Sequence, residues 1–257
     1  MTAPTLHVQG LTGRVLRGVD IEVRACEVVG LVGTKGSGID ELLDVLCGFD
    51  PPLHGSIELL GEDVTRTEPH RRAALGLRRT FGAGGLIEDT TSLANLLSAQ
   101  HLLAGYGAVR GLVTSVFGEE LDLTDRAEEM LRRFGVSDGR VRDLDARTRR
   151  HLVWAMATIA SPQLLVMDEP TVGASLDDED EIAHEIRALD VPAILLADRH
   201  VPFVLSVADH VYCLDAGRVV AAGPPDEVRG DPAVAEALLG VSGRRLRRRR
   251  SSSARPA

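Results

Sequence analysis

The chain has 257 residues, a net charge of −9 and 44% hydrophobic residues, a composition typical of a soluble globular protein with a sizeable core. No apolar run reaches the length needed to cross a membrane, and the first residues lack the basic and apolar regions of a secretion signal. Setting aside the seven arginines of 244–257 leaves −16 on residues 1–243, which argues against a specific nucleic-acid partner.

Short β-type runs separated by turn residues open the chain, at 6–8, 19–23 and 28–32. The third run is followed by a glycine-rich turn and an amphipathic stretch that ends at Gly48, a predicted helix C-cap. Strand, glycine turn and helix in this order predict a phosphate-binding loop, because glycines let backbone N–H groups converge on phosphate oxygens at a helix N-terminus. The loop reads Gly33, Thr34, Lys35, Gly36, Ser37, Gly38, Ile39, Asp40.

The last two positions of this loop carry unexpected side chains. Such a loop needs Lys for the outer phosphates and then Ser or Thr for Mg²⁺, and here the residues are Ile39 and Asp40. We therefore predict a retained backbone cradle that has lost its charge chemistry. Two compensations stay open: Lys35, the only lysine of the chain, reaches the nucleotide, or Asp40 binds Mg²⁺ directly.

The chain beyond the loop predicts an α/β fold. A strand near Ile57 and a short helix over 69–75 precede a mostly helical region over 90–160. Strands return at 164–167 and 193–197 and in a hairpin over 211–220, with helices from about 178 and over 231–239. We predict a mixed sheet with flanking helices, an N-terminal antiparallel part and a helical subdomain at about 85–160.

Several other residues have two interpretations each. The apolar patch is either core or a docking surface; it consists of Leu86, Ile87, Leu93, Leu96 and Leu97. The arginine-rich tail over 244–257 is predicted to be disordered, either simply solvated or in contact with anionic lipid or RNA. The three cysteines, Cys26, Cys47 and Cys213, are interpreted as reduced core residues. Packing or surface roles, rather than metal binding, are predicted for Trp154 and for His70, His101, His151, His184, His200 and His210.

One segment carries the most specific family signal, LLVMDEPTVGASLD at 164–177. Together with GFDPPLHGSIELLGEDVTRTEPHRRAALGLRRTFG and ADHVYCLDAGRVVAAGPPDEVRGDPAVAEALLG, it resembles the ATP-binding subunits of ABC transporters, especially the branched-chain amino acid importer type. The resemblance spans about residues 6–240. It implies a P-loop NTPase core of the ABC type over 1–243, with ATP and Mg²⁺ as cofactors.

The resemblance also assigns roles. Asp168 matches the Walker B aspartate that holds Mg²⁺ through water, and Glu169 matches the glutamate that polarises the attacking water. Ser175, Leu176 and Asp177 match the D-loop, which crosses the dimer interface.

Four other family motifs are altered. Gly82 replaces the Q-loop glutamine, and Arg199 replaces the switch histidine, with His200 one place too late. The signature aligns with 144–148, where Arg147 replaces a glycine that approaches the partner's phosphate; its side chain either blocks that approach or offers a guanidinium. Residues 11–18 contain no aromatic to stack on adenine.

The resemblance implies an ATP-binding subunit for import of branched-chain amino acids or similar small solutes. We expect weak or no hydrolysis, permease subunits and a competent second ATP-binding subunit as partners, and a cytoplasmic, peripheral place on the inner face of the membrane. The alternatives are a non-enzymatic ABC-like scaffold or regulator, and an active ATPase despite the substitutions.

Overall fold

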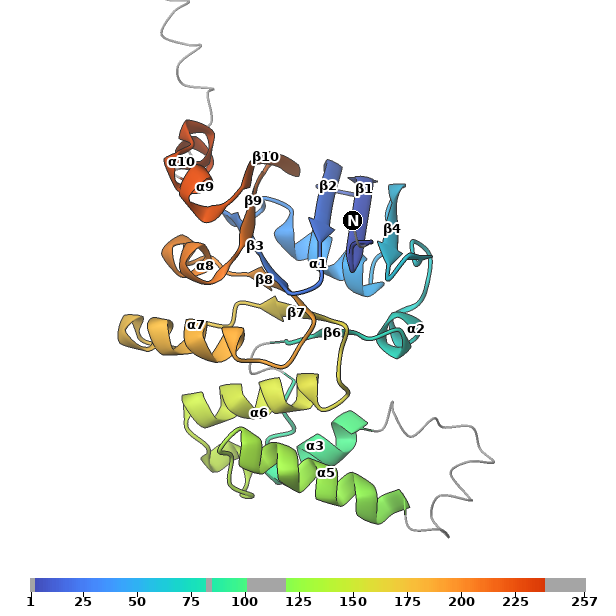
Figure 1. Cartoon of the computed structure of the whole chain (residues 1–257), viewed down its shortest axis with the longest axis vertical. Helices are drawn as coiled ribbons and strands as arrows, with labels where there is room; N and C mark the ends of the chain where they lie inside the picture. The colour runs from blue at the N-terminus through green and yellow to red at the C-terminus, as the bar shows by residue number, and fades with distance from the viewer. Residues whose placement is uncertain (1–2, 82–84, 101–118, 239–257) are drawn as a thin grey trace, which may run out of the picture.

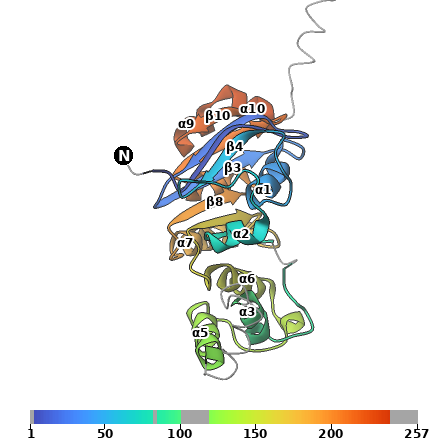
Figure 2. The same ribbon diagram turned by 90° about the vertical axis from the view of Figure 1, so that its right-hand side faces the viewer.

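Two β-sheets lie towards one end of the long axis of the molecule, and a helical layer forms the other end (Figures 1 and 2). The structure, a computed structural model, describes residues 3–81, 85–100 and 119–238. Gly82, His101 and the arginine-rich tail therefore lie outside the described residues. Within the described part, no helix combines the length and the apolar character that a membrane span requires.

The larger sheet has the strand order β10-β9-β3-β8-β7-β6. All neighbouring pairs are parallel except the hairpin of β9 and β10. The predicted mixed sheet is thus confirmed. In chain order its strands are β3 (Glu27–Gly33), β6 (Leu77–Arg79), β7 (Leu164–Asp168), β8 (Ala193–Ala197), β9 (His210–Asp215) and β10 (Arg218–Gly223).

The smaller sheet is the predicted N-terminal antiparallel part. Its order is β2-β1-β4-β5, and each neighbouring pair is antiparallel. Its strands are β1 (Leu6–Thr12), β2 (Arg17–Val23), β4 (His54–Leu59) and β5 (Glu62–Asp63).

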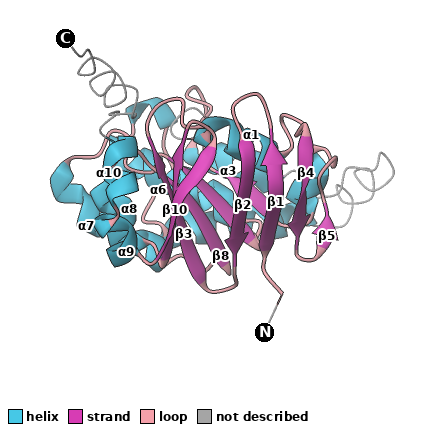
Figure 3. Cartoon of the chain, turned by 90° about the horizontal axis from the view of Figure 1, so that it is seen from above, coloured by secondary structure: helices cyan, strands magenta, loops and turns pink. Residues whose placement is uncertain are grey.

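Strand β3 is buried on both faces because it separates two cores. Val29 and Leu31 pack towards the smaller sheet and helix α1 (Ile39–Cys47). Val28 and Val32 point to the other face, which is covered by helices (Figure 3). This alternation explains the continuous apolar run before the glycine loop. The covering helices are α7 (Glu179–Arg187), α8 (Val201–Val207), α9 (Pro225–Gly230) and α10 (Pro232–Leu238).

The helical layer has a third core of its own. Leu96 and Leu152 are fully buried in it, and Leu86 is almost so, whereas Ile87 is half-exposed. Most of the predicted apolar patch is therefore core. The helices of this layer are α3 (Ser92–Gln100), α5 (Glu119–Arg133) and α6 (Ala146–Thr158).

A buried arginine fixes the far end of α1. Arg72, on helix α2 (Pro69–Ala74), is 1% exposed, and its Nη1 donates to the carbonyls of Val45 and Leu46, each at 2.7 Å. Its Nε donates to the carbonyl of Thr67 at 2.9 Å. Burial lowers the pKa of Arg72, and the helix C-terminus compensates the charge with its free carbonyls. The contact anchors the helix that carries the phosphate loop.

The prediction for the cysteines was wrong at one position. Cys26 is exposed in the turn between β2 and β3, with a left-handed φ of 62°. Cys47 and Cys213 are buried as predicted, and burial raises the pKa of each thiol to about 11.

Candidate nucleotide site

The glycine loop forms the predicted cradle between β3 and α1. Gly36 and Gly38 adopt left-handed φ angles of 84° and 108°, and the Ser37 N–H donates to the carbonyl of Thr34 at 2.9 Å. A Cβ on Gly33 would lie 2.6 Å from the carbonyl oxygen of Leu214, so only glycine fits there. The loop is therefore a tight, glycine-dependent turn at the N-terminus of α1, the place where a phosphate would bind.

The side chains at the start of α1 carry no cation. Ile39 is partly buried and packs against the core, while Asp40 is exposed in the first helical turn. Lys35 is exposed on the loop itself. A carboxylate near a helix N-terminus is favourable for the helix and repels a bound phosphate.

The carboxylate of Asp168, at the end of β7, forms an ion pair with Arg79. Asp168 Oδ2 lies 2.8 Å from Nη2 of Arg79, whose Nη1 lies 2.7 Å from Oδ1 of Asp44 on α1. The Arg79 side chain is 9% exposed. Burial alone would lower its pKa, but hydrogen bonds to the two aspartates outweigh burial and raise it. Arg79 thus ties Asp168 to α1 as a fixed positive charge.

The next residue is paired in the same way. Glu169 has a left-handed φ of 46°, and its carboxylate forms an ion pair with Arg199. The buried Asp198 holds the surrounding loops by accepting from the N–H and the hydroxyl of Thr171, at 3.1 and 2.7 Å, and from the N–H of His200. Both acidic groups beside the glycine loop therefore have guanidinium partners.

These groups converge on one cleft. The cavity that they leave is about 20 Å³, room for roughly one water molecule. The structure brings together most of the residues predicted for the site. The cleft is lined by Gly33, Thr34, Lys35, Ser37, Ile39, Asp40, Asp168, Glu169, Ala197, Asp198 and Arg199.

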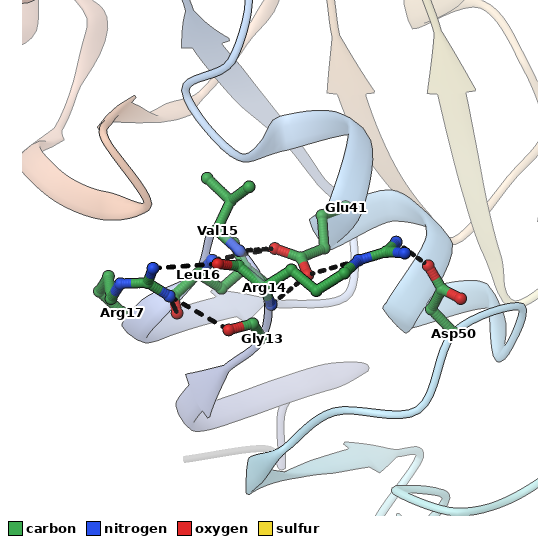
Figure 4. Close-up of polar contacts among 7 residues, drawn as sticks. All are labelled: Gly13, Arg14, Val15, Leu16, Arg17, Glu41 and Asp50. Atoms are coloured by element: carbon green, nitrogen blue, oxygen red, sulfur yellow. Dashed lines mark hydrogen bonds and ion pairs between the residues drawn. The ribbon is translucent and has the colours of Figure 1, made fainter.

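Residues 13–17 form a strap across the start of α1. They belong to the segment 11–18, which contains no aromatic residue to stack on adenine. The carboxylate of Glu41 accepts the backbone N–H groups of Arg14, Val15 and Leu16 at 2.5, 2.7 and 2.9 Å (Figure 4). A Cβ on Gly217, in the β9–β10 turn, would lie 1.9 Å from the Val15 carbonyl, so the strap packs directly on that turn.

The sequence pattern did not single out Glu41 as a site residue. Burial raises its pKa, but the three backbone donors and the nearby Arg14 outweigh burial and hold the pKa below its ordinary value. Its only signal in the sequence was a second acid directly after Asp40, at a helix face that is otherwise apolar.

Helix α6 begins within the signature segment, and the residue that caps its N-terminus is Asp145. Asp145 accepts the N–H of Thr148 at 2.8 Å as a side-chain cap, which lowers the pKa of Asp145. Arg147 turns towards α7, with its Nη2 2.5 Å from Oε1 of Glu181 and 3.4 Å from Oε1 of Glu185. Its guanidinium is therefore engaged within the chain.

The D-loop segment lies apart from the cleft. Ser175 and the side chain of Asp178 form a reciprocal capping box around a short 3₁₀ turn. Leu176 and Asp177 are exposed on that turn. Their predicted role at a dimer interface stays a prediction.

A glycine loop between a parallel strand and a helix, with an acidic pair at the end of another parallel strand of the same sheet, defines the phosphate-binding-loop class of nucleotide-binding proteins. The comparisons with known proteins narrow this class. The family model described as "ABC transporter" matches residues 16–172. The chain belongs to the ABC transporter ATP-binding family.

Named relatives match almost the whole chain. The high-affinity branched-chain amino acid transport ATP-binding protein LivG of Salmonella typhimurium is 31% identical over 253 residues, covering 93% of this chain and 99% of LivG. BraF of Pseudomonas aeruginosa, which carries the same description, is 30% identical with the same coverage. The ADP conformation of MJ1267, an ATP-binding cassette of an ABC transporter, superimposes with a TM-score of 0.79 at 25% identity, covering 93% of this chain and all of MJ1267.

Proposed function

We propose that this chain is a degenerate ATP-binding subunit of an importer for branched-chain amino acids or similar small solutes. It sits on permease subunits at the inner face of the membrane and pairs with a second, catalytically competent subunit. The import of amino acids is supported by the descriptions of LivG and BraF. The loss of hydrolysis is supported by the chemistry of the cleft.

The charge at the phosphate loop carries the proposal. Ile39 supplies no cation and Asp40 adds a carboxylate, so a triphosphate loses one attraction and gains one repulsion. Two unit charges 4 Å apart interact by roughly 4 kcal/mol at an effective dielectric constant near 20. A micromolar affinity is worth about 8 kcal/mol, so these two changes remove most of it.

The donor set does not fit a hydrolytic Mg²⁺ site. Asp168 and Glu169 are each paired with an arginine, whose positive charge opposes the binding of a metal ion at the same carboxylates. Phosphoryl transfer depends almost wholly on placed charges. We therefore propose no catalytic step at this cleft, and the ATP and Mg²⁺ of the family are weakly bound or lost here.

The second candidate is a non-enzymatic ABC-like scaffold or regulator. The signature segment favours it, because Asp145 occupies the α6 N-terminus with a negative charge and Arg147 pairs with α7. In a dimer of this family, each nucleotide site joins the phosphate loop of one chain to the signature segment of the other. Under this candidate, neither of the two sites would be fully built.

The test is calorimetry of Mg-ATP binding to the purified chain, beside the double revertant Ile39→Lys, Asp40→Thr. We expect no binding heat from the natural chain up to millimolar ATP, and micromolar binding by the revertant. Tight binding by the natural chain would refute the charge argument, and Lys35→Ala would then show whether the loop lysine compensates. Phosphate release is then measured for the revertant by itself. This measurement separates a loss of ATP binding from a loss of the hydrolytic chemistry.

A further inference from the structure

A second cleft lies between the helical layer and the helices that cover the large sheet. It has a volume of about 250 Å³ and is formed by α5, α6 and the end of α7, which lie next to one another in Figure 1. None of its lining residues belongs to the phosphate-loop cleft. Its apolar floor consists of Met130, Phe134, Trp154 and Leu189.

The wall of this cleft carries charges of both signs. Arg133 and Asp190 stand at its exposed rim with a separation of 3.9 Å, too long for a tight ion pair. Glu185 and His151 lie deeper, with side chains 24% and 15% exposed. An apolar floor with a cation and two carboxylates above it suits an amphipathic ligand with both charges.

Glu185 has spare acceptor capacity. Its Oε1 faces His151 Nε2 at 2.9 Å and Arg147 at 3.4 Å. Its Oε2 is buried and has no hydrogen-bond partner among the residues that the structure describes. A buried carboxylate oxygen without a donor is costly, and a rotation of the Glu185 side chain that turns Oε2 into the cleft towards a ligand's donor would remove that cost.

We propose that this cleft binds a free α-amino acid with an apolar side chain. Arg133 takes the carboxylate, Glu185 and Asp190 take the ammonium group, and the side chain lies on Trp154 and the apolar floor. The cleft is small for a ligand site, and its volume suits a molecule of about ten non-hydrogen atoms. The ligand class follows from the cleft; only the choice of leucine as the probe rests on the proposed function.

Such a ligand would bridge two parts of the fold. Met130 and Arg133 belong to α5 and Trp154 to α6, whereas Glu185 belongs to α7 and Asp190 follows it. A bound amino acid therefore ties the helical layer to the sheet-bearing core, at the point where Glu185 already contacts His151 of α6.

The only tryptophan of the chain, Trp154, lines this cleft and gives a direct assay. L-leucine is titrated into the purified full chain without nucleotide while tryptophan emission is recorded. We expect a saturable change in the millimolar range, absent with isovalerate, which lacks the amine, and with isoamylamine, which lacks the carboxylate. Because no nucleotide is present, the outcome is independent of the ATP-binding test.

The matched variants are Arg133→Gln and Arg132→Gln. Arg132 is the neighbouring arginine of α5 and pairs with Glu129 away from the cleft lining. Loss of a charged hydrogen bond predicts about tenfold weaker leucine binding for Arg133→Gln and unchanged binding for Arg132→Gln. Glu185→Gln should weaken binding similarly, with circular dichroism confirming the fold.

Three results would overturn the proposal. They are no saturable response up to the solubility limit of leucine, equal responses to isovalerate or isoamylamine, and equal affinities of the two arginine variants. If Glu185→Gln does not fold, the comparison of the arginine variants still decides, because both positions are on the surface of α5.

Discussion

Replacing Glu41 by Gln tests the strap contact most directly. The carboxylate accepts three backbone N–H groups, one at Oε1 and two at Oε2, in a side chain that is 9% exposed. Glutamine has one acceptor oxygen, so its NH₂ group must face at least one backbone donor, and the negative charge is lost. With hydrogen bonds to charged groups worth about 1.5–3 kcal/mol, and an unpaired buried donor costing about 1–3, we expect a loss of about 3 kcal/mol.

The assay is equilibrium unfolding in urea and by heat. For a domain of this size, a loss of about 3 kcal/mol lowers Tm by about 6–12 °C. Asp40→Asn is the matched control, because it removes the adjacent exposed charge from the same helical turn and should destabilise the fold much less. A Glu41→Gln variant as stable as Asp40→Asn would refute the reasoning.

The pH dependence gives a second check on the same residue. The pKa of Glu41 is lowered in the folded state, so its stabilisation is present above the unfolded pKa, which is near 4.5. The stabilisation is lost as the pH falls through the lower folded pKa, because protonated Glu and Gln are then equivalent. The gap between the natural chain and Glu41→Gln should therefore close in acid, and a gap that stays constant would contradict the assignment.

Two further predictions concern buried groups. Arg72→Met removes donors to the last carbonyls of α1 and should lower the free energy of unfolding, measured in urea, by about 3–5 kcal/mol. The control is Arg71→Met at an exposed position, which should be nearly neutral. Equal effects of the two changes would show that the buried guanidinium is not a structural anchor. For the thiols, Ellman's reagent should label Cys26 quickly at pH 8 and reach Cys47 and Cys213 only on unfolding. The reason is that burial raises the pKa of Cys47 and Cys213 to about 11. Fast labelling of more than one thiol would disprove this prediction.

Local patterns predicted the cradle and its setting. The apolar run before Gly33 and the amphipathic stretch after Asp40 are signals contained within a few residues, and the structure has β3 and α1 in those places. The same holds for the buried run at 164–167, which became β7 with Asp168 at its end. These elements depend on periodicity, which the sequence displays directly.

The pairing of the charged side chains could not be predicted in this way. Arg79 and Asp168 are 89 positions apart, and Arg199 meets Glu169 only because β7 and β8 are adjacent in the sheet. The strand that carries Arg79 has three residues and two arginines, too short and too polar to predict as β. Such contacts depend on the strand order, which the local pattern does not contain.

The strand order also sets when the fold can form during synthesis. Strands β1, β2 and β4 are close in sequence and can pair early. Strand β3 cannot, since Gly30 pairs with Leu196 and Val211, so about 180 residues must follow before its partners exist. At about 5–20 residues per second, a ribosome needs roughly ten to forty seconds for that length. For this interval both edges of β3 lack a partner strand, and unpaired strand edges in a partly made chain are prone to aggregation.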